Sequence, residues 1–181
     1  MNEKKIVRAA MVIVGNEILS GRTQDVNLQY LAKGLNEVGV RLSEVRVVPD
    51  TEDAIVGAVN ALRAAFDYVF TTGGIGPTHD DITAGCIAKA FGVPLICNPE
   101  ARALLEAHYK KTGRELNESR LRMAHTPEGA TLIANPISTA PGFHIECLCV
   151  GRRACRDAGN AGWAEGRPRG RRNGALPDCR R

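Results

Sequence analysis

A glycine-rich segment followed by two acids, TGGIGPTHDDIT at residues 72–83, has the residue types that bind a phosphate group. Glycines let backbone N–H groups approach an anion closely, and a helix that begins near the acids adds the positive end of its dipole. The segment is not a P-loop, because no Lys-Ser/Thr pair follows its glycines. The ligand contacts that we expect within it are Gly73, Gly74, Gly76, Thr78 and Thr83.

Asp80 and Asp81 give this segment a second chemical role. Two carboxylates beside a phosphate would repel it, unless a divalent metal bridges carboxylate and phosphate or one carboxylate hydrogen-bonds a sugar or pterin edge. A simpler interpretation is that Asp80 caps the following helix and that the glycines only form a tight turn. We favour the ligand site for the whole string, because two adjacent acids exceed what one cap needs.

Alternating strand and helix patterns predict the scaffold that holds this segment. Strands are expected at residues 6–14, 40–48, 67–71, 131–134 and 142–145. Helices are expected at residues 27–38, from residue 51 onward, and at 80–91, 99–112 and 117–125. The order of strands and helices is typical of an α/β protein with a parallel sheet and helices on both faces.

Two further polar clusters follow predicted strands. The cluster Gly15, Asn16 and Glu17 comes after the first strand, and Asp50 comes after the second. Ligands in open α/β sheets bind at the carboxyl ends of the strands, so both clusters should converge with the glycine-rich segment. Glu17 is equally well explained as an acid in the first turn of a helix. We expect Asp50 to be a helix N-cap that can also have a second role at the site.

Composition narrows the classes of function. Aromatic residues make up only 4% of the chain, which argues against a base-stacking nucleic-acid surface. The longest apolar run near the start, residues 9–14, is too short for a membrane span or a signal peptide, so we expect a cytoplasmic protein with no membrane partner. The four histidines are scattered, and only His79 is expected near the site.

Four motifs together resemble the molybdopterin-binding domain shared by molybdenum-cofactor biosynthesis proteins, and most of all its CinA-like (competence/damage-inducible protein A) branch. The motifs are VGNEILSGRTQDVN, VVPD, TTGGIGPTHDDIT and NPISTAPGF, and they run from about residue 7 to residue 146. The resemblance implies a three-layer α/β/α fold with the ligand pocket at these loops, to which Pro141 and Gly142 also contribute. It implies homo-oligomer formation in many members as well.

The resemblance also implies two functions. In CinA-like members this domain is linked to metal-dependent cleavage of a nucleotide pyrophosphate such as ADP-ribose, which releases AMP. The catalytic residues would then be Asp81, Asp80 and Asp50, and Mg²⁺, Mn²⁺ or Co²⁺ would be held by Asp81 with Asp80 or Glu17. The alternative is a module that binds molybdopterin or a nucleotide without turnover, as part of molybdenum-cofactor metabolism.

Residues 147–181 depart from the pattern of the α/β domain expected at residues 1–146. They hold nine Arg, no Lys and three acids, a net charge of +6, whereas the preceding residues carry a net charge of −2. A one-base shift near codon 147 permits an apolar strand, a Gly-Val-Pro turn and a helix start, so we predict a frame slip, a disordered tail and a lost last strand and helix. Nucleic acid becomes a candidate partner only if this basic tail is authentic.

Overall fold

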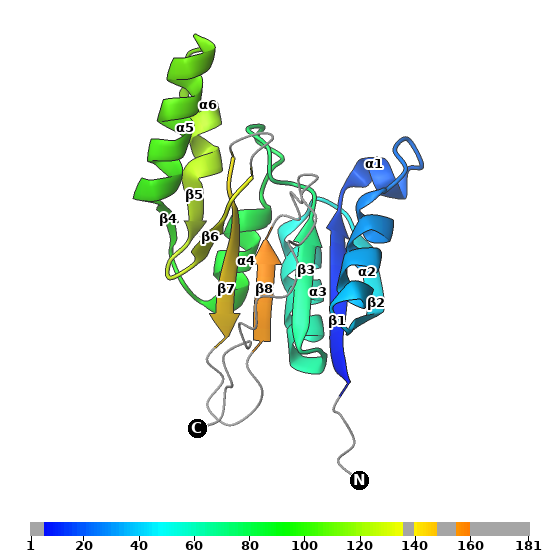
Figure 1. Ribbon diagram of the computed structural model, residues 1–181. Coiled ribbons are helices and arrows are strands. Elements are labelled where there is room, and N and C mark those ends of the chain that lie inside the picture. Colours follow the sequence, from blue (N-terminus) through cyan, green and yellow to red (C-terminus); the bar gives the residue numbers. More distant parts are fainter. Residues whose placement is uncertain (1–5, 136–139, 148–154, 160–181) are drawn as a thin grey trace.

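The computed structural model describes residues 6–135, 140–147 and 155–159. Its larger sheet contains β1 (Val7–Val14), β2 (Val40–Val48), β3 (Tyr68–Thr72), β6 (Thr131–Ile133), β7 (Gly142–Cys147) and β8 (Cys155–Gly159). The strand order is β2-β1-β3-β8-β7-β6 (Figure 1). The strands β2, β1, β3 and β8 run parallel to one another, and β7 runs antiparallel to both β8 and β6. This is the mostly parallel α/β sheet that the sequence predicts.

Strand β1 is buried on both of its faces. Its even-numbered residues from Ala10 to Val14 pack with α3 (Glu52–Ala65) and α4 (Thr83–Phe91). Its odd-numbered residues from Ala9 to Ile13 pack with α2 (Asn27–Glu37). A strand covered on both faces needs a continuous apolar run rather than an alternating one, which is what residues 9–14 provide. Helices therefore lie on both faces of the sheet, and the three-layer prediction is confirmed.

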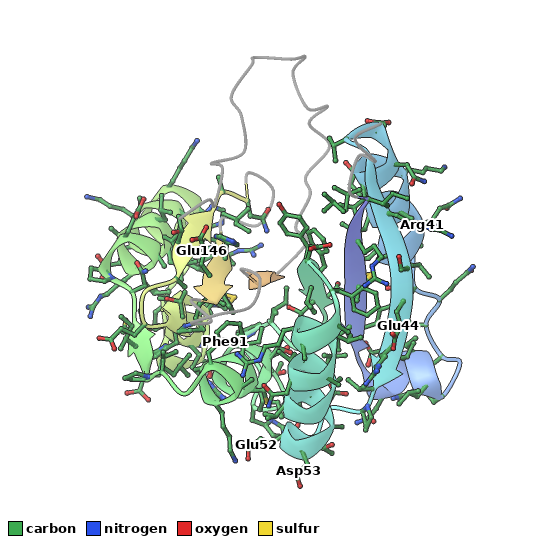
Figure 2. All side chains as sticks on the ribbon, turned by 90° about the horizontal axis from the view of Figure 1, so that it is seen from below. Arg41, Glu44, Glu52, Asp53, Phe91 and Glu146 are labelled. Carbon is green, nitrogen blue, oxygen red and sulfur yellow. The ribbon has the colours of Figure 1, made fainter. Side chains whose placement is uncertain are left out.

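Strand β2 forms one edge of the sheet and carries a bulge opposite residues 9 and 10. Figure 2 shows Arg41 and Glu44 on this strand, seen from below. Glu44 Oε1 accepts a hydrogen bond from Arg46 Nε at 2.8 Å. Bulges and charged side chains hinder an exposed strand from pairing with another chain, so the edge is protected.

An insert at residues 95–127 stands between α4 and β6. It consists of β4 (Leu95–Cys97), α5 (Pro99–Thr112), α6 (Glu118–Leu121), the 3₁₀ helix η1 (Arg122–Ala124) and β5 (His125–Pro127), which pairs with β4. The side chain of Asn98 caps α5 by accepting hydrogen bonds from Glu100 N–H and Ala101 N–H at 3.0 and 3.1 Å. Figure 1 shows α5 and α6 at the end of the large sheet toward which β1 and β3 point. The insert thus reaches the carboxyl ends of the parallel strands.

Most predicted elements have close counterparts in the structure. Residues 40–48 and 99–112 form a strand and a helix with the predicted bounds, and the predicted helix at 117–125 is α6 followed by η1. The sequence pattern misses the short strands β4 and β5 and the four-residue helix α1 (Asn16–Leu19). In the described ranges, no helix has the length and hydropathy needed to cross a membrane.

Strand β8 lies in the segment for which the sequence predicts a disordered tail. It is placed between β3 and β7, and Tyr68 of β3 stands in register with Arg156 of β8. Sheet pairing uses backbone groups, so a strand can form here without an apolar period in its sequence. These five residues therefore form a strand where the sequence predicts a disordered tail. Residues 148–154 and 160–181 lie outside the described ranges, so the frame slip and the boundary at residue 146 stay predictions.

Candidate functional site

The glycine-rich segment forms a loop at residues 73–82, here called the glycine loop, which connects β3 to α4. Gly73 and Gly74 have positive φ angles of 91° and 60°. A Cβ atom at Gly73 would lie 1.9 Å from the carbonyl oxygen of Val14 at the end of β1. The loop therefore leaves β3 with its backbone against the end of β1, and no side chain fits at that point.

Thr83, the first residue of α4, holds the start of the glycine loop. Its hydroxyl donates a hydrogen bond to the Gly73 carbonyl at 2.9 Å, and its backbone N–H donates to the Gly74 carbonyl at 3.1 Å. A Cβ atom at Gly74 would lie 2.5 Å from that hydroxyl. Because Thr83 is buried and its hydroxyl is already used, its contacts support a role in shaping the loop, and direct contact with a ligand stays a prediction.

Asp81 folds back against the glycine loop. Its Oδ2 atom accepts hydrogen bonds from the backbone N–H and the hydroxyl of Thr78, at 2.7 and 2.5 Å. A Cβ atom at Gly76 would lie 2.8 Å from the same oxygen, so glycine at this position makes room for the carboxylate. Within the described ranges Oδ1 of Asp81 accepts no hydrogen bond. Asp81 therefore has one carboxylate oxygen to offer to a ligand.

Asp50 joins the ends of β1 and β2. Its Oδ2 atom accepts a hydrogen bond from the backbone N–H of Asn16 at 2.7 Å, and the N–H of Gly15 donates to the Val48 carbonyl at 3.1 Å. The predicted N-cap role of Asp50 is wrong, since the N-cap of α3 is Thr51. Because the helix begins one residue later, the Asp50 side chain is left to reach across to the neighbouring loop. Two of the three predicted polar clusters thus converge.

The carboxylates of Glu17 and Asp80 lie close to residues that are near them in the sequence. A Cβ atom at Gly15 would lie 2.5 Å from Glu17 Oε1, so the Glu17 carboxylate lies over Gly15. Asp80 Oδ1 lies 3.1 Å from His79 Nε2, and the two side chains are 72% and 88% exposed. The N-cap of α4 is Ile82, so the alternative cap role of Asp80 is wrong.

In the part of the chain that the structure describes, no three His, Cys, Asp or Glu residues are arranged to hold a metal. Metal binding by Asp81, Asp80 and Glu17 stays a prediction.

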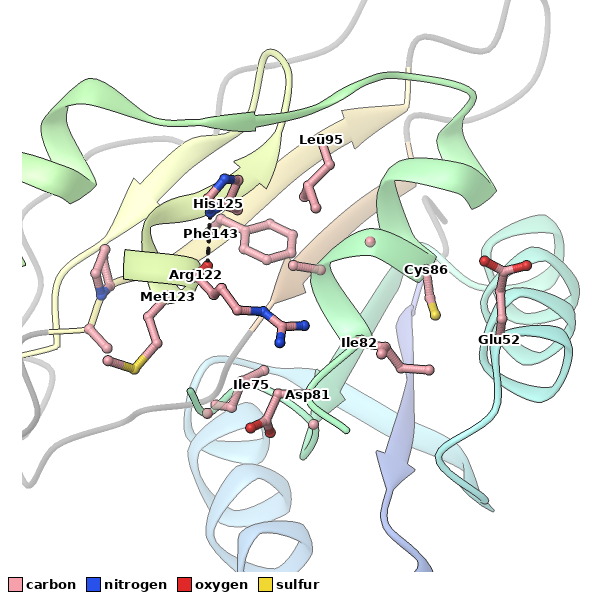
Figure 3. A pocket seen from close by; sticks show the side chains of 16 residues that line it. Glu52, Ile75, Asp81, Ile82, Cys86, Leu95, Arg122, Met123, His125 and Phe143 are labelled. Atoms are coloured by element: carbon pink, nitrogen blue, oxygen red, sulfur yellow. Dashed lines mark hydrogen bonds between the residues drawn. The ribbon is translucent and has the colours of Figure 1, made fainter. Parts of the chain in front are cut away.

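A cavity of about 460 Å³ lies between the glycine loop, α4 and the insert. Figure 3 shows Ile75 and Asp81 on one side of it and Leu95, His125 and Phe143 on the other, with the side chain of Arg122 extending between them. Such a volume suits a small molecule that carries a ring and a phosphate. The cavity therefore combines an apolar wall with a polar loop.

Only part of the predicted site lines this cavity. The lining includes Gly74, Gly76, Asp81 and Pro141 among the predicted residues. Thr78 lines a second, neighbouring hollow, whereas Gly142 is buried at the start of β7 and pairs with Ile133. The others stand at the neighbouring loops without lining the cavity: Gly15, Asn16, Glu17, Asp50, Gly73, Asp80 and Thr83. Their roles as catalytic or ligand-binding residues stay predictions.

Residues of the insert and of α4 complete the cavity, and the sequence does not predict them. Arg122 and His125 come from the end of the insert, and Gly85 comes from the first turn of α4. A Cβ atom at Gly85 would have only Leu95 Cδ2 within 4 Å, at 3.8 Å, so its missing side chain leaves the cavity open. The expectation that only His79 lies near the site is wrong, because His125 lines the cavity. A glycine inside a helix, where it is disfavoured, is the one local signal that points to Gly85.

Cys86 also lines the cavity, but its thiol is not a nucleophile at neutral pH. Burial raises the pKa of this thiol to about 11, and the Glu52 carboxylate adds to the rise while Lys89 opposes it. Only a thiolate attacks an electrophile, so Cys86 stays protonated and unreactive in the folded protein. It is a packing residue beside the site.

We expect iodoacetamide to label Cys86 at pH 8 in the urea-unfolded protein but not in the folded protein, as measured by mass spectrometry of its peptide. Because the folded state keeps this proton to a higher pH than the unfolded state, the thiol contributes stability that is present below about pH 9. That stability is lost as the pH rises toward about 11. The urea midpoint should accordingly fall over this interval, and equal labelling of the folded and unfolded protein at pH 8 would contradict the prediction.

Known proteins resemble this chain along most of its length. Residues 10–154 match the family described as "Probable molybdopterin binding domain". A protein of Caldivirga maquilingensis is 40% identical over 140 residues, which cover 77% of this chain and 54% of that protein. A CinA-like protein of Citrifermentans bemidjiense is 38% identical over 149 residues, which cover 82% of this chain and 35% of that protein. The chain thus spans between about a third and about half of the length of these curated relatives.

Solved structures share the fold. The protein CinA of Thermoplasma acidophilum, of unknown function, matches with a TM-score of 0.72 and 35% identity, over 85% of this chain and 88% of that one. The tungsten cofactor synthesizing protein MoaB of Pyrococcus furiosus matches with a TM-score of 0.54 at 16% identity, over 86% of this chain and 82% of that one, which shows the fold alone. The chain described here therefore belongs to the molybdopterin-binding-domain family, in its CinA-like branch.

Proposed function

We propose that the domain binds a pterin or nucleotide phosphate in its cavity and, with a divalent metal, hydrolyses a nucleotide pyrophosphate such as ADP-ribose to release AMP. The observation that carries this proposal is that one cavity joins Asp81 of the glycine loop to an apolar wall. Family membership supports a ligand of the pterin type. Homo-oligomer formation and a cytoplasmic location stay predictions.

The cavity suits a ligand with two chemically different parts. Leu95, Met123 and Phe143 provide apolar surface on which a flat ring such as a purine or pterin can lie. Gly74 and Gly76 belong to the loop that ends at the beginning of α4, where the helix dipole is positive and favours an anion. The ligand would therefore place its ring toward the insert and its phosphate toward the glycine loop.

A divalent metal fits this site as a partner shared between protein and phosphate. Asp81 offers Oδ1 alone, since Oδ2 is held by Thr78. Mg²⁺ is commonly bound by one or two carboxylates together with substrate phosphates and waters, so one protein oxygen is enough for this mode of binding. When bound, such an ion polarises the phosphoryl group and favours attack by water.

The chain's own residues would orient the substrate. The glycine loop, tied to α4 by Thr83, presents its backbone to the phosphate, and the apolar wall shields the ring from water. Water adds to one phosphorus atom, the bond to the bridging oxygen breaks, and that oxygen leaves with the second phosphate. The products from ADP-ribose are AMP and ribose 5-phosphate, and the proton that the attacking water loses goes to solvent. Positioning of this kind lowers the barrier because the reacting groups are already oriented.

A non-catalytic binding module is the second candidate, and one contact favours it. The two hydrogen bonds from Thr78 to Oδ2 give Asp81 a structural use that needs no metal. In a binding module the remaining oxygen would accept a hydrogen bond from a hydroxyl or a pterin N–H rather than hold an ion. The cavity and the glycine loop would serve both functions equally.

Measurement of AMP release distinguishes the two functions. We expect AMP to accumulate when the protein is incubated with ADP-ribose or FAD and Mg²⁺, Mn²⁺ or Co²⁺, and we expect EDTA to stop it. Calorimetric titration of the same compounds in EDTA reports binding without turnover. Tight binding with no AMP under any metal would replace the hydrolase with the binding module, and the absence of both would contradict the two functions together.

A further inference from the structure

Arg122 lies where two hollows of the surface meet. It lines the cavity of the candidate site, and it also lines a second hollow of about 430 Å³. The second hollow is bounded on one side by Pro77, Thr78 and His79 of the glycine loop and on the other by Asn117, Ser119 and Arg120 near α6. One guanidinium thus belongs to both spaces, next to the loop that is expected to receive a phosphate.

The guanidinium of Arg122 has no hydrogen-bond or ion-pair partner among the described residues. Several other arginines of the domain are engaged by the fold. Arg102 pairs with Glu106 at 2.7 Å, and Arg120 donates to the Glu115 carbonyl and lies over the Tyr109 ring. Arginine is always protonated and carries five donors in a planar fork that matches phosphate oxygens. Arg122 therefore has donors that the fold itself does not use.

The backbone of Arg122 is held firmly while its side chain extends into the cavity (Figure 3). Its carbonyl accepts hydrogen bonds from the backbone N–H and, at 3.2 Å, from ring Nδ1 of His125. Two residues along the chain, Ala124 is fully buried against α5, and its carbonyl accepts a hydrogen bond from the N–H of Asn98 at 2.9 Å. A charged group on such a fixed platform is well placed to bind a ligand with defined geometry.

We propose that Arg122 is a phosphate-binding residue of this domain, which holds the ligand's phosphate from the insert side at the junction of the two hollows. The proposal rests on the proposed function for the phosphate ligand. It identifies Arg122 as the source of the positive charge that the glycine loop lacks. The phosphate would lie between the loop backbone and the guanidinium. Binding by Arg122 would also offset the repulsion between the phosphate and Asp81.

The test is calorimetric titration of inorganic pyrophosphate in EDTA, so that neither metal nor turnover is involved. We expect Arg122→Gln to weaken the affinity by about 10- to 100-fold, since hydrogen bonds to charged groups are among the strongest. The affinity of Arg122→Lys should lie between that of the unaltered chain and that of Arg122→Gln, because lysine keeps the charge but lacks the planar fork of donors. Arg114→Gln is the matched control: it removes the same charge from an exposed position of the same insert and lines neither hollow, and its affinity should change less than about twofold.

The outcomes separate this proposal from the hydrolase. Equal affinities of Arg122→Gln and Arg114→Gln would overturn it, as would a failure of the unaltered chain to bind pyrophosphate. Absence of AMP release, with a selective loss of pyrophosphate binding in Arg122→Gln, would instead remove the hydrolase and leave Arg122 as a phosphate-binding residue. Thermal unfolding of each variant checks that it folds, and an exposed position such as 122 should leave the midpoint nearly unchanged.

Discussion

Replacing Gly73 with alanine should destabilise the domain by at least about 3 kcal/mol, which is enough to unfold much of a marginally stable protein. Two costs add at this position. The φ angle of 91° is unfavourable for a residue with a side chain, and the new Cβ would lie 1.9 Å from the Val14 carbonyl oxygen. No rotation of a methyl group relieves a contact with backbone, so β1 and β3 would have to move apart.

Gly21→Ala is the matched control for this prediction. Gly21 has a φ angle of 72°, and no atom lies within 4 Å of the position where its Cβ would stand. It should therefore show only the conformational cost of about 1–2 kcal/mol. Urea unfolding of both variants, followed by circular dichroism, gives the difference that belongs to the contact with β1. Equal loss of stability in the two variants would contradict the argument.

The contact at Gly73 also shows what the sequence alone leaves out. The glycines of the loop are predicted from their ability to let backbone N–H groups approach a phosphate, and this reason is local. The structure adds a reason that depends on two strands far apart in sequence, because Gly73 lies against the end of β1. A glycine can therefore be required by packing at a position where a ligand is the more obvious explanation.

The elements that the sequence predicts well are those whose signals are local. Helix α5 has Asn98 as its cap, Pro99 as its first residue and Gly113 in the left-handed conformation at its end. These residue types mark helix ends, so both boundaries can be predicted from the sequence. The three-residue strands β4 and β5 are too short to show a period, and they exist because they pair with each other. Strand β8 likewise depends on its neighbours β3 and β7.

The same distinction applies to the candidate site. The convergence of Asn16 and Asp50 follows from the rule that carboxyl ends of parallel strands share one edge, and the structure confirms it. The sequence does not predict Arg122 as a site residue, because its position at the site depends on the placement of the insert beside the glycine loop. Neighbouring residues do not mark it as different from the other arginines of the same stretch.

Asp81→Asn should lower the rate of AMP release from ADP-ribose by at least about 100-fold, the loss typical of removing one electrostatic contact at a reacting centre. The amide oxygen of asparagine can still accept the hydrogen bonds that Thr78 donates at 2.7 and 2.5 Å, so the glycine loop keeps its shape. What the substitution removes is the negative charge that would hold a divalent metal beside the phosphate. The rate is measured by chromatography of AMP at saturating metal.

Asp53→Asn makes this test specific to the site. Asp53 is exposed in the first turn of α3, and its substitution removes the same charge without touching the cavity. We expect it to keep the rate of the unaltered chain, while Asp81→Asn keeps its thermal midpoint but loses turnover. If Asp81→Asn released AMP at a rate close to that of the control, the carboxylate would serve only to hold Thr78. The protein would then be a hydrolase that needs no metal at Asp81, and the proposed role of this carboxylate in turnover would be wrong.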